Sequence, residues 1–307
     1  MSSGDATGHI LSVCIVNWNT RELLRACLES LRRNPSARAQ LEIIVVDNAS
    51  SDSSAELVAR DFPEVRLLAN AENRGYAAGN NQAIAASGGE YVLLLNPDTE
   101  VAPGALDKLL EFLRDHPEAA GVAPRLVGPD GATQRSCRGF PDPWAVFADA
   151  LGLARLFPRS RRLGRYRLTW WNHDDLREVD QPMASALLLR RSALKRVGAF
   201  DEDFPIFFND VDLCYRLKQA GWRLYFDPEA TVLHHHGAST AQVRRRMIIE
   251  SHRSLARFYR KHYRGRRGCW PVLALNRLGL WLRLAALALR GGGRQEDSPA
   301  PGREIGA

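Results

Sequence analysis

The sequence predicts an α/β protein built on a mostly parallel sheet flanked by helices, with a basic, amphipathic helical extension at its C-terminus. Two observations support this prediction. Between residues 9 and 127, short apolar runs rich in β-branched residues alternate with segments of helical periodicity, which is the pattern of strands joined by crossover helices. Arginines then crowd residues 244–267, whereas acidic residues are commoner in the first two thirds of the chain, which indicates a separate basic region.

The first four expected strands are apolar throughout, as strands buried on both faces of a sheet are. Three of them end in polar residues, at Asp47, at Asn70 and at Asn96-Pro97-Asp98. Ligands bind beyond the carboxyl ends of such strands, so Asp98 lies where this sheet would hold a ligand. The expected strands are residues 9–18, 41–47, 65–70 and 90–96, and the expected helices are residues 20–33, 50–62 and 75–87.

The remainder of the chain is less regular. After Pro103 a helix to about His116 and a short strand at 120–127 are expected, whereas residues 128–182, rich in Arg, Trp, Pro and Gly, give no clear order of elements. Further on, the sequence predicts a strand and a helix within 183–200, a helix from about 210 to 220, and short strands after it. The segment from Ala241 is expected to be helical and basic, and residues 291–307 to be disordered.

Composition limits the class of protein. The formal charge of +7 and the pI of about 9.4 favour an anionic partner, such as nucleic acid, anionic lipid or a phosphorylated substrate. The five cysteines are scattered and odd in number, which indicates reduced thiols rather than a disulfide framework or a zinc site. The first residues contain no apolar stretch typical of a secretion signal, so a cytoplasmic protein is expected.

The first strand-to-helix turn, "VNWNTREL", contains no glycine. A dinucleotide site requires G-x-G-x-x-G at this position, and a P-loop requires G-x-x-x-x-G-K. Neither motif occurs in a suitable context anywhere in the chain. The sequence therefore argues against dinucleotide enzymes, P-loop NTPases and the sugar-nucleotide pyrophosphorylases, which also open with a Gly-rich phosphate loop.

Taken together, the segments resemble family 2 glycosyltransferases of the GT-A fold, a Rossmann-like arrangement, and in particular their rhamnosyltransferase-like branch. The stretches that carry the resemblance follow one another in the family's order and cover most of residues 10–240. They are "VCIVNWNTRELLRACLESL", "IIVVDNASSDSS", "NAENRGYAAGNNQAI", "YVLLLNPDTEV", "MASALLLRRSAL", "FFNDVDLCYRLKQAGWRLYFDPEA" and "HHHGAS".

The resemblance implies a nucleotide site that includes Asn17, Asp47, Arg74 and Asn96. In the family the aspartate at the position of Asp47 hydrogen-bonds the nucleotide base. From the residues alone, Asp47 is equally well explained as the N-cap of the following helix. Arg74 suits a phosphate contact, and an exposed surface arginine explains it almost as well.

The tetrapeptide Asn-Pro-Asp-Thr at 96–99 stands at the position of the family's D-x-D motif. Asn96 replaces the first aspartate, which leaves Asp98 as the single strong ligand to hold Mg²⁺ or Mn²⁺ against the two phosphates of a donor. The rhamnosyltransferase-like branch often has the same N-P-D form, although a simple β-turn is also typical of these residues. "HHHGAS" resembles the family's H-x-x-G-x-S element, which makes His234 a second metal ligand, while His235 would face the other side of a strand.

Asn209-Asp210 stands where the family usually has Glu-Asp, which implies that Asp210 is the general base of an inverting transfer. Asp212 is the competing candidate, and an aspartate at a helix N-terminus also needs no catalytic role to be favourable. Three aromatic residues precede Asp210 and would help to exclude water from it, namely Phe204, Phe207 and Phe208.

Within the C-terminal extension, Arg277 and Arg283 interrupt an apolar run at 270–290. A spanning helix needs about 20 apolar residues without such charges, so a helix lying in the membrane interface fits better. Packing of this helix on the catalytic domain or on a second subunit of a homodimer explains the pattern nearly as well. Nucleic-acid binding is disfavoured, because no binding motif accompanies the charge.

The expected domains are a GT-A catalytic domain at 8–240, with a nucleotide-sugar half at 8–125 and an acceptor half at 126–240, then a helical extension at 241–290 and a tail at 291–307. The resemblance implies a metal-dependent inverting glycosyltransferase that carries a sugar, such as rhamnose from dTDP-rhamnose, to a lipid-linked saccharide of a cell-surface polysaccharide. The enzyme would be cytoplasmic or peripheral at the inner face of the plasma membrane. The alternatives are a UDP-sugar donor, or a membrane-peripheral nucleotide-sugar-binding protein without turnover.

Overall fold

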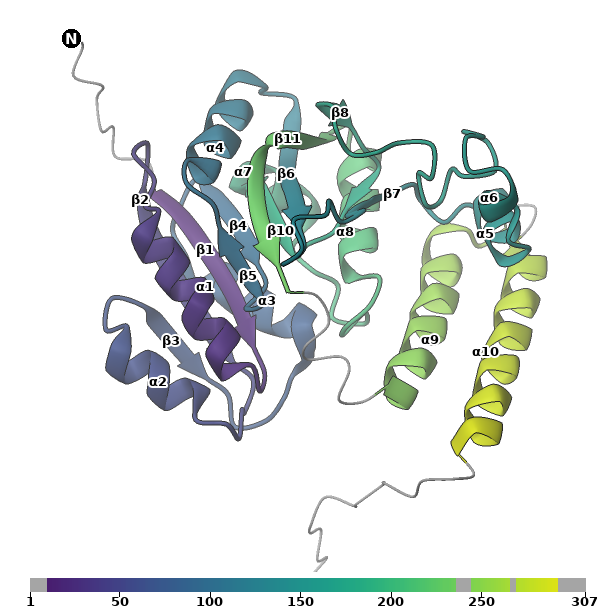
Figure 1. Cartoon of the computed structure of the whole chain (residues 1–307), viewed down its shortest axis with the longest axis horizontal. Helices are drawn as coiled ribbons and strands as arrows, with labels where there is room; N and C mark the ends of the chain where they lie inside the picture. Colours follow the sequence, from purple (N-terminus) through teal and green to yellow (C-terminus); the bar gives the residue numbers. More distant parts are fainter. Residues whose placement is uncertain (1–9, 236–243, 266–268, 292–307) are drawn as a thin grey trace, which may run out of the picture. The chain divides into compact units, whose positions relative to one another are not determined.

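The computed structural model describes residues 10–235, 244–265 and 269–291. The chain divides into two compact units, residues 1–243 and residues 244–307 (Figure 1). The expected absence of a secretion signal concerns residues outside the described part, as does the expected disorder after residue 291. Gly237 and Ser239 of the "HHHGAS" element also lie outside it.

A sheet of nine strands forms the middle of the first unit, in the order β3-β2-β1-β4-β10-β6-β11-β5, with β8 paired to β11. The first four strands are parallel, as the alternating pattern predicts. They are β1 (Ile10–Asn17), β2 (Gln40–Asp47), β3 (Arg66–Ala69) and β4 (Tyr91–Leu95).

Helices cover both faces of this sheet and create two separate cores. Successive residues of a strand point to opposite faces, so Val13 and Ile15 enter one core while Cys14 and Val16 enter the other. The first core packs against α1, α2 and α4, and the second against α3, α7 and α8. The helices are α1 (Arg21–Arg33), α2 (Ser54–Asp61), α3 (Gly75–Ala86), α4 (Ala105–Asp115), α7 (Arg191–Val197) and α8 (Asn209–Gln219).

The second half of the sheet departs from the simple parallel order. β10 (Ala186–Arg190) lies between β4 and β6 and is antiparallel to both, so its first residue lies beside the last residue of β4. The short strands expected after residue 220 are one twelve-residue strand, β11, with two register shifts along its parallel pairing to β6. The strands are β5 (Thr99–Val101), β6 (Ala119–Val127), β8 (Arg177–Glu178) and β11 (Arg223–His234).

The segment 128–182, for which no order could be predicted, contains two short helices and two short strands besides β8. β7 and β9 pair with each other in a separate two-stranded sheet. These elements are β7 (Cys137–Arg138), α5 (Pro143–Ala150), α6 (Leu153–Leu156) and β9 (Gln181–Pro182).

Two helices make up the described part of the second unit, α9 (Arg244–His262) and α10 (Cys269–Gly291). The side chains of His252 and Asn276 join them, since the His252 ring nitrogen lies 2.6 Å from the Asn276 amide oxygen. Among the described residues, no helix combines the length and the hydropathy that crossing a bilayer requires.

Candidate functional site

The carboxyl ends of β1, β2, β4 and β11 meet at one edge of the large sheet and bring polar side chains together. Asn17 ends β1 and is paired in register with Asp47, which ends β2. His234 ends β11 and is paired with Thr99, directly after Asp98. Residues from four distant parts of the sequence therefore meet where the sheet was predicted to hold its ligand.

Asp47 is fixed from two sides. Its side chain accepts a hydrogen bond from the Asn17 amide at 2.8 Å and another from the backbone N–H of Ser50 at 2.8 Å. Asn17 also accepts a 2.6 Å bond from the Thr20 hydroxyl. Both Asn17 and Asp47 are buried. Each carboxylate oxygen keeps a lone pair beyond these bonds, so Asp47 can still accept from a ring N–H.

Among the described residues, no hydrogen bond or ion pair joins Arg74 to this cluster. It is exposed and precedes α3. The backbone N–H groups of Tyr76 and Ala77, in the first turn of α3, both donate to the Pro205 carbonyl, at 2.8 and 3.2 Å. Because Pro205 occupies these donors, the first turn of α3 is tied to the loop before α8 rather than open to an anion.

Asp98 and His234 form the most distinctive pair of the edge. The Nε2 atom of His234 lies 3.5 Å from an Asp98 carboxylate oxygen, and both residues are buried. Gln134 holds the histidine ring through its Oε1 atom, 2.7 Å from Nδ1, while its Nε2 donates to the His234 carbonyl at 2.8 Å. Since that second bond orients the amide, Nδ1 donates to Gln134, and in the neutral ring the lone pair of Nε2 then faces Asp98.

The donor set of this pair suits a hard divalent cation. Carboxylate oxygen and imidazole nitrogen are both common metal ligands, and an outer partner such as Gln134 is what fixes a ligating histidine. The buried Oδ1 of Asn96 has no hydrogen-bond partner, while its Nδ2 donates to the Ser185 hydroxyl at 3.3 Å. The described residues contain no cluster of three or more His, Cys, Asp or Glu side chains suited to a metal, so substrate oxygens or water would have to complete the coordination.

His235 points elsewhere, as the strand alternation predicts. Its Nε2 lies 3.0 Å from a Glu100 carboxylate oxygen, and its backbone N–H donates to the Asp98 carbonyl at 2.9 Å. The structure therefore brings His234, and not His235, to the Asp98 carboxylate.

Asp210 and Asp212 occupy the first turn of α8 but have different surroundings. Asp212 is fully buried and forms a 2.7 Å ion pair with Arg216, whose other donors contact carbonyls at the end of α7 and just beyond it. Asp210 is partly exposed, and its carboxylate accepts from the Gln181 amide at 3.0 Å and from the Val211 N–H at 2.8 Å. The protein packed around the Asp210 carboxylate desolvates it and raises its pKa, while backbone N–H groups counteract part of that rise.

The backbone before Asp210 is held in an unusual conformation. Phe208 caps α8 with φ +66°, in the left-handed region that a bulky side chain rarely adopts. Asn209 uses its side chain to hold the turn, since its Nδ2 donates to the Ile206 carbonyl at 2.8 Å and its Oδ1 accepts from the Asp210 N–H at 2.7 Å. Strain of this kind is typical of functional sites.

Ala184 and Ser185 connect Asn96 to Tyr76. The Ser185 hydroxyl accepts from the Asn96 amide at 3.3 Å, and the Ala184 carbonyl accepts from the Tyr76 hydroxyl at 3.0 Å. Gln181, three residues before Ala184, donates to the Asp210 carboxylate at 3.0 Å. Burial raises the pKa of the Tyr76 hydroxyl, and the negative charges of Asp210 and Asp98 raise it further.

Three residues of the site escaped the sequence analysis. Tyr76 lies in the quoted segment "NRGYAAGNN" and an aromatic residue among small ones was a usable signal. Gln134 and Gln181 lie in the segment without predictable order, 100 residues from His234 and 29 from Asp210 respectively. No local pattern marks either glutamine.

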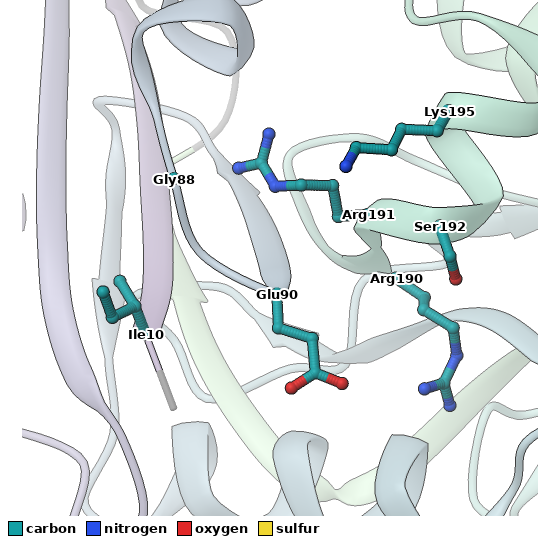
Figure 2. Close-up of a pocket in the computed structure, with 7 residues that line it drawn as sticks. All are labelled: Ile10, Gly88, Glu90, Arg190, Arg191, Ser192 and Lys195. Carbon is teal, nitrogen blue, oxygen red and sulfur yellow. The ribbon is translucent and has the colours of Figure 1, made fainter. Parts of the chain in front are cut away.

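One open pocket of the described residues lies away from this edge. It has a volume of about 450 Å³ and lies where β1 and β4 begin, with Ile10, Glu90 and Lys195 among its lining (Figure 2). Its two other cationic side chains, Arg190 and Arg191, donate to the backbone carbonyls of His116 and Ile84, among others. These arginines therefore join structural elements, and the candidate site is the polar edge at the opposite ends of the strands.

Comparison with known proteins identifies the family. Residues 12–175 match the model of glycosyl transferase family 2. The chain belongs to this family. Over 296 residues it is 30% identical to N-acetylglucosaminyl-diphospho-decaprenol L-rhamnosyltransferase of Mycobacterium tuberculosis, covering 92% of this chain and 91% of that protein. It is 32% identical over 210 residues to the pre-mycofactocin glycosyltransferase of the same organism, covering 67% of this chain and 40% of that one.

Solved structures confirm the fold of this family 2 chain. The mannosyltransferase PcManGT of Pyrobaculum calidifontis, in complex with GDP-Man and Mn²⁺, superposes with a TM-score of 0.57 at 20% identity, covering 95% of this chain and 78% of that one. GalNAc-T7 with UDP, GalNAc and Mn²⁺ superposes with a TM-score of 0.55 at 15% identity, covering 75% of this chain and 44% of that one. These structures confirm the predicted GT-A fold, and the sequence matches confirm the rhamnosyltransferase-like resemblance.

Proposed function

We propose that this family 2 glycosyltransferase transfers L-rhamnose, with inversion, from dTDP-rhamnose to an N-acetylglucosamine unit carried on a polyprenyl diphosphate. The mechanism rests on the polar edge of the sheet, where Asp47 and the Asp98–His234 pair lie. It also rests on Asp210, which is held by Gln181, four residues before the Ser185 that bonds to Asn96. The choice of sugar and acceptor is supported by the similarity, along 92% of the chain, to a rhamnosyltransferase named for such an acceptor.

Asp47 would bind the base of the donor. With its two oxygens already accepting from Asn17 and Ser50, the carboxylate is held rigidly, and its remaining lone pairs can accept from the N3–H of a thymine. Uracil has the same N3–H, so this contact does not distinguish dTDP from UDP. Asn17 would act by orienting Asp47, and Arg74, exposed at the start of α3, would approach the donor phosphates.

Asp98 and His234 would hold a divalent cation, and the unpartnered Oδ1 of Asn96 would accept from the donor or from water at the same place. When bound, the cation would neutralise the negative charge that develops on the departing diphosphate. Because one ligand is an imidazole nitrogen and Mg²⁺ prefers oxygen ligands, we expect Mn²⁺ to be bound more tightly than Mg²⁺.

Asp210 would be the general base. The acceptor hydroxyl oxygen forms a bond to C1 of the sugar on the face opposite the phosphate, its proton passes to the Asp210 carboxylate, and the C1–O bond breaks with its electron pair leaving on the nucleotide diphosphate. The raised pKa of Asp210 makes it a stronger base than an ordinary aspartate. Asp212, committed to Arg216, would have a structural role.

The second unit would bring the enzyme to its lipid-linked acceptor. On α10, large apolar side chains recur at helical spacing and are exposed, which suits a helix lying in the headgroup region. The exposed residues are Trp270, Leu278, Trp281 and Leu282.

Purified full-length protein, incubated with a short-chain polyprenyl diphosphate N-acetylglucosamine, Mn²⁺ and dTDP-rhamnose, tests the proposal. Mass spectrometry of the product should show one added deoxyhexose, and NMR should show the opposite anomeric configuration to that of the donor. The donor site is tested separately by thermal unfolding with dTDP, UDP or GDP, with Mn²⁺ or with chelator. A nucleotide at about 100 times its Kd should stabilise the fold by about 2.7 kcal/mol.

The two assays divide the alternatives. Transfer from UDP-sugars but not from dTDP-rhamnose would replace the donor in the proposal while keeping the reaction. Metal-dependent nucleotide binding without transfer to any saccharide acceptor, and unchanged by Asp210→Ala, would favour a nucleotide-sugar-binding protein without turnover.

A further inference from the structure

The two short helices between β7 and β8 carry their large apolar side chains outward. On α5, Ala145 and Ala148 are buried, whereas Trp144 and Phe147 are 41% and 43% exposed. Leu151 lies one turn beyond Phe147 and is 53% exposed. This is the reverse of the usual arrangement, in which a surface helix buries its large apolar face and exposes its small or polar residues.

The exposed apolar surface continues through α6. Leu156 is 70% exposed and Phe157 is 56% exposed. Contiguous exposed apolar side chains of this size mark a contact surface rather than ordinary surface composition.

Arginines outnumber acidic residues around these side chains. Residues 151–167 contain six arginines and no acidic residue. Arg165 and Arg167 pair with Asp142 and Asp149. The other four form no ion pair among the described residues, although Arg162 lies over the Trp144 ring at 5.2 Å.

We propose that this surface, the α5–α6 patch, docks on an anionic lipid bilayer. Tryptophan and phenylalanine would enter the interface while the arginines without an ion pair contact lipid phosphates, which is how amphipathic surfaces bind membranes. The patch consists of Trp144, Phe147, Leu151, Leu156 and Phe157 together with Arg155, Arg159, Arg161 and Arg162.

The charge of the patch argues against a second copy of the chain as its occupant. Two copies joined through the same patch would place the same unpaired arginines against each other, because a twofold interface is self-complementary. An anionic bilayer supplies the complementary charge and an apolar interior at once.

The position of the patch in the chain gives it a role in the proposed reaction. The segment that contains the patch, residues 128–182, also carries Gln134 and Gln181, which hold His234 and Asp210. Docking of this segment would bring the catalytic unit itself to the surface where a polyprenyl-linked acceptor resides. This consequence depends on the proposed function, whereas membrane binding by the patch does not.

The test measures co-sedimentation of the full-length protein with vesicles of phosphatidylcholine and phosphatidylglycerol, without donor or acceptor. The apolar variant is Trp144→Ser/Phe147→Ser/Leu156→Ser, and its matched control is Leu176→Ser, which changes a side chain 52% exposed on the same unit. The charge variant is Arg155→Gln/Arg159→Gln, and its matched control is Lys195→Gln/Arg196→Gln on α7. A further variant, Trp270→Ser/Trp281→Ser, removes the exposed aromatic residues of α10.

We expect the charge variant to weaken vesicle binding about 30-fold, which corresponds to about 1 kcal/mol for each arginine near an anionic surface. The apolar variant should lose most binding, and both controls should bind as the unmodified chain does. Thermal midpoints should agree among all variants, because exposed substitutions change little in the folded state.

Unchanged vesicle binding in both patch variants overturns the proposal, including the case in which only the α10 variant loses binding. A patch variant that keeps vesicle binding but sediments as a smaller species, or unfolds at lower temperature, shows that protein covers the patch and also overturns it. The vesicle assay requires no sugar transfer, and transfer to a water-soluble acceptor requires no vesicles. Failure of the patch proposal can therefore be distinguished from failure of the proposed function.

Discussion

Asp210 and Asp212 lie in one helical turn, and we expect a catalytic role for the first and a structural role for the second. The perturbation is the same isosteric change at both positions, Asp210→Asn and Asp212→Asn. Each replaces a carboxylate with a neutral amide of nearly the same shape, so differences in outcome report on charge and on its partners.

For Asp212 the structure predicts a loss of stability. The Asp212 carboxylate is fully buried, and the Arg216 side chain beside it is only 18% exposed. Removing one charge of a buried pair leaves the other uncompensated and costs roughly 3–5 kcal/mol. Taking about 3 kcal/mol, because Arg216 keeps its carbonyl partners near the end of α7, the thermal midpoint should fall by roughly 6–12 °C for a unit of this size.

For Asp210 the structure predicts a loss of transfer instead. A general base contributes about 10²–10⁴ to the rate, so kcat of Asp210→Asn should fall by that factor while nucleotide binding stays. Calorimetry and a transfer assay on both variants, with Asp212→Asn assayed below its midpoint, measure the two effects. The reasoning is refuted if Asp210→Asn keeps full turnover, or if Asp212→Asn keeps its midpoint and loses transfer.

Three further predictions concern the rest of the site. As pH rises from about 4, the unmodified chain should lose stability relative to Asp210→Asn, because the raised pKa means that ionisation of Asp210 costs stability. A stability difference that stays constant from acid to neutral pH would contradict this. Gln134→Ala should weaken Mn²⁺ binding about 10–100-fold in a titration followed by thermal shift, since a partner that orients a metal ligand has effects of this size. Asp98→Asn should abolish the Mn²⁺ dependence. Equal Mn²⁺ titrations in the unmodified chain and both variants would exclude Asp98 and His234 as metal ligands. Gly79→Ala should cost about 1–3 kcal/mol in chemical denaturation, because the added Cβ would stand 2.8 Å from a Val16 methyl in a packed core; an unchanged midpoint would show that this contact relaxes freely.

The sequence alone was sufficient for the parts of the fold that local patterns determine. Continuous apolar runs indicated the places of β1 to β4, and the polar residues after them located the edge that Asp47 and Asp98 share. These inferences succeeded because a short, continuously apolar run between helical segments is typical of a strand buried on both faces, and because parallel strands of one sheet must end at the same edge.

Local patterns fail where distant segments decide the geometry. Nothing near residue 134 indicates that its side chain holds the ring of His234, since the contact depends on the pairing of β11 with β6. The order of elements in 128–182 was not predictable for the same reason. One signal was overlooked: Asp212 and Arg216 have i, i+4 spacing on a helix, which is a known pairing distance, and it would have favoured Asp210 as the carboxylate available for catalysis.

The two asparagines that interrupt the family's acidic pattern have different consequences. Asn209 uses both ends of its amide in the turn before Asp210, and a glutamate there could not donate to the Ile206 carbonyl. Asn96 removes a negative charge beside Asp98, in a place where a donor diphosphate would bring several more. Fewer carboxylates weaken the hold on a cation but also reduce repulsion of the diphosphate, so the loss of an acidic residue need not mean the loss of a donor site. With Asp98 alone and His234 oriented by Gln134, we expect the edge to bind a cation together with its substrate rather than permanently.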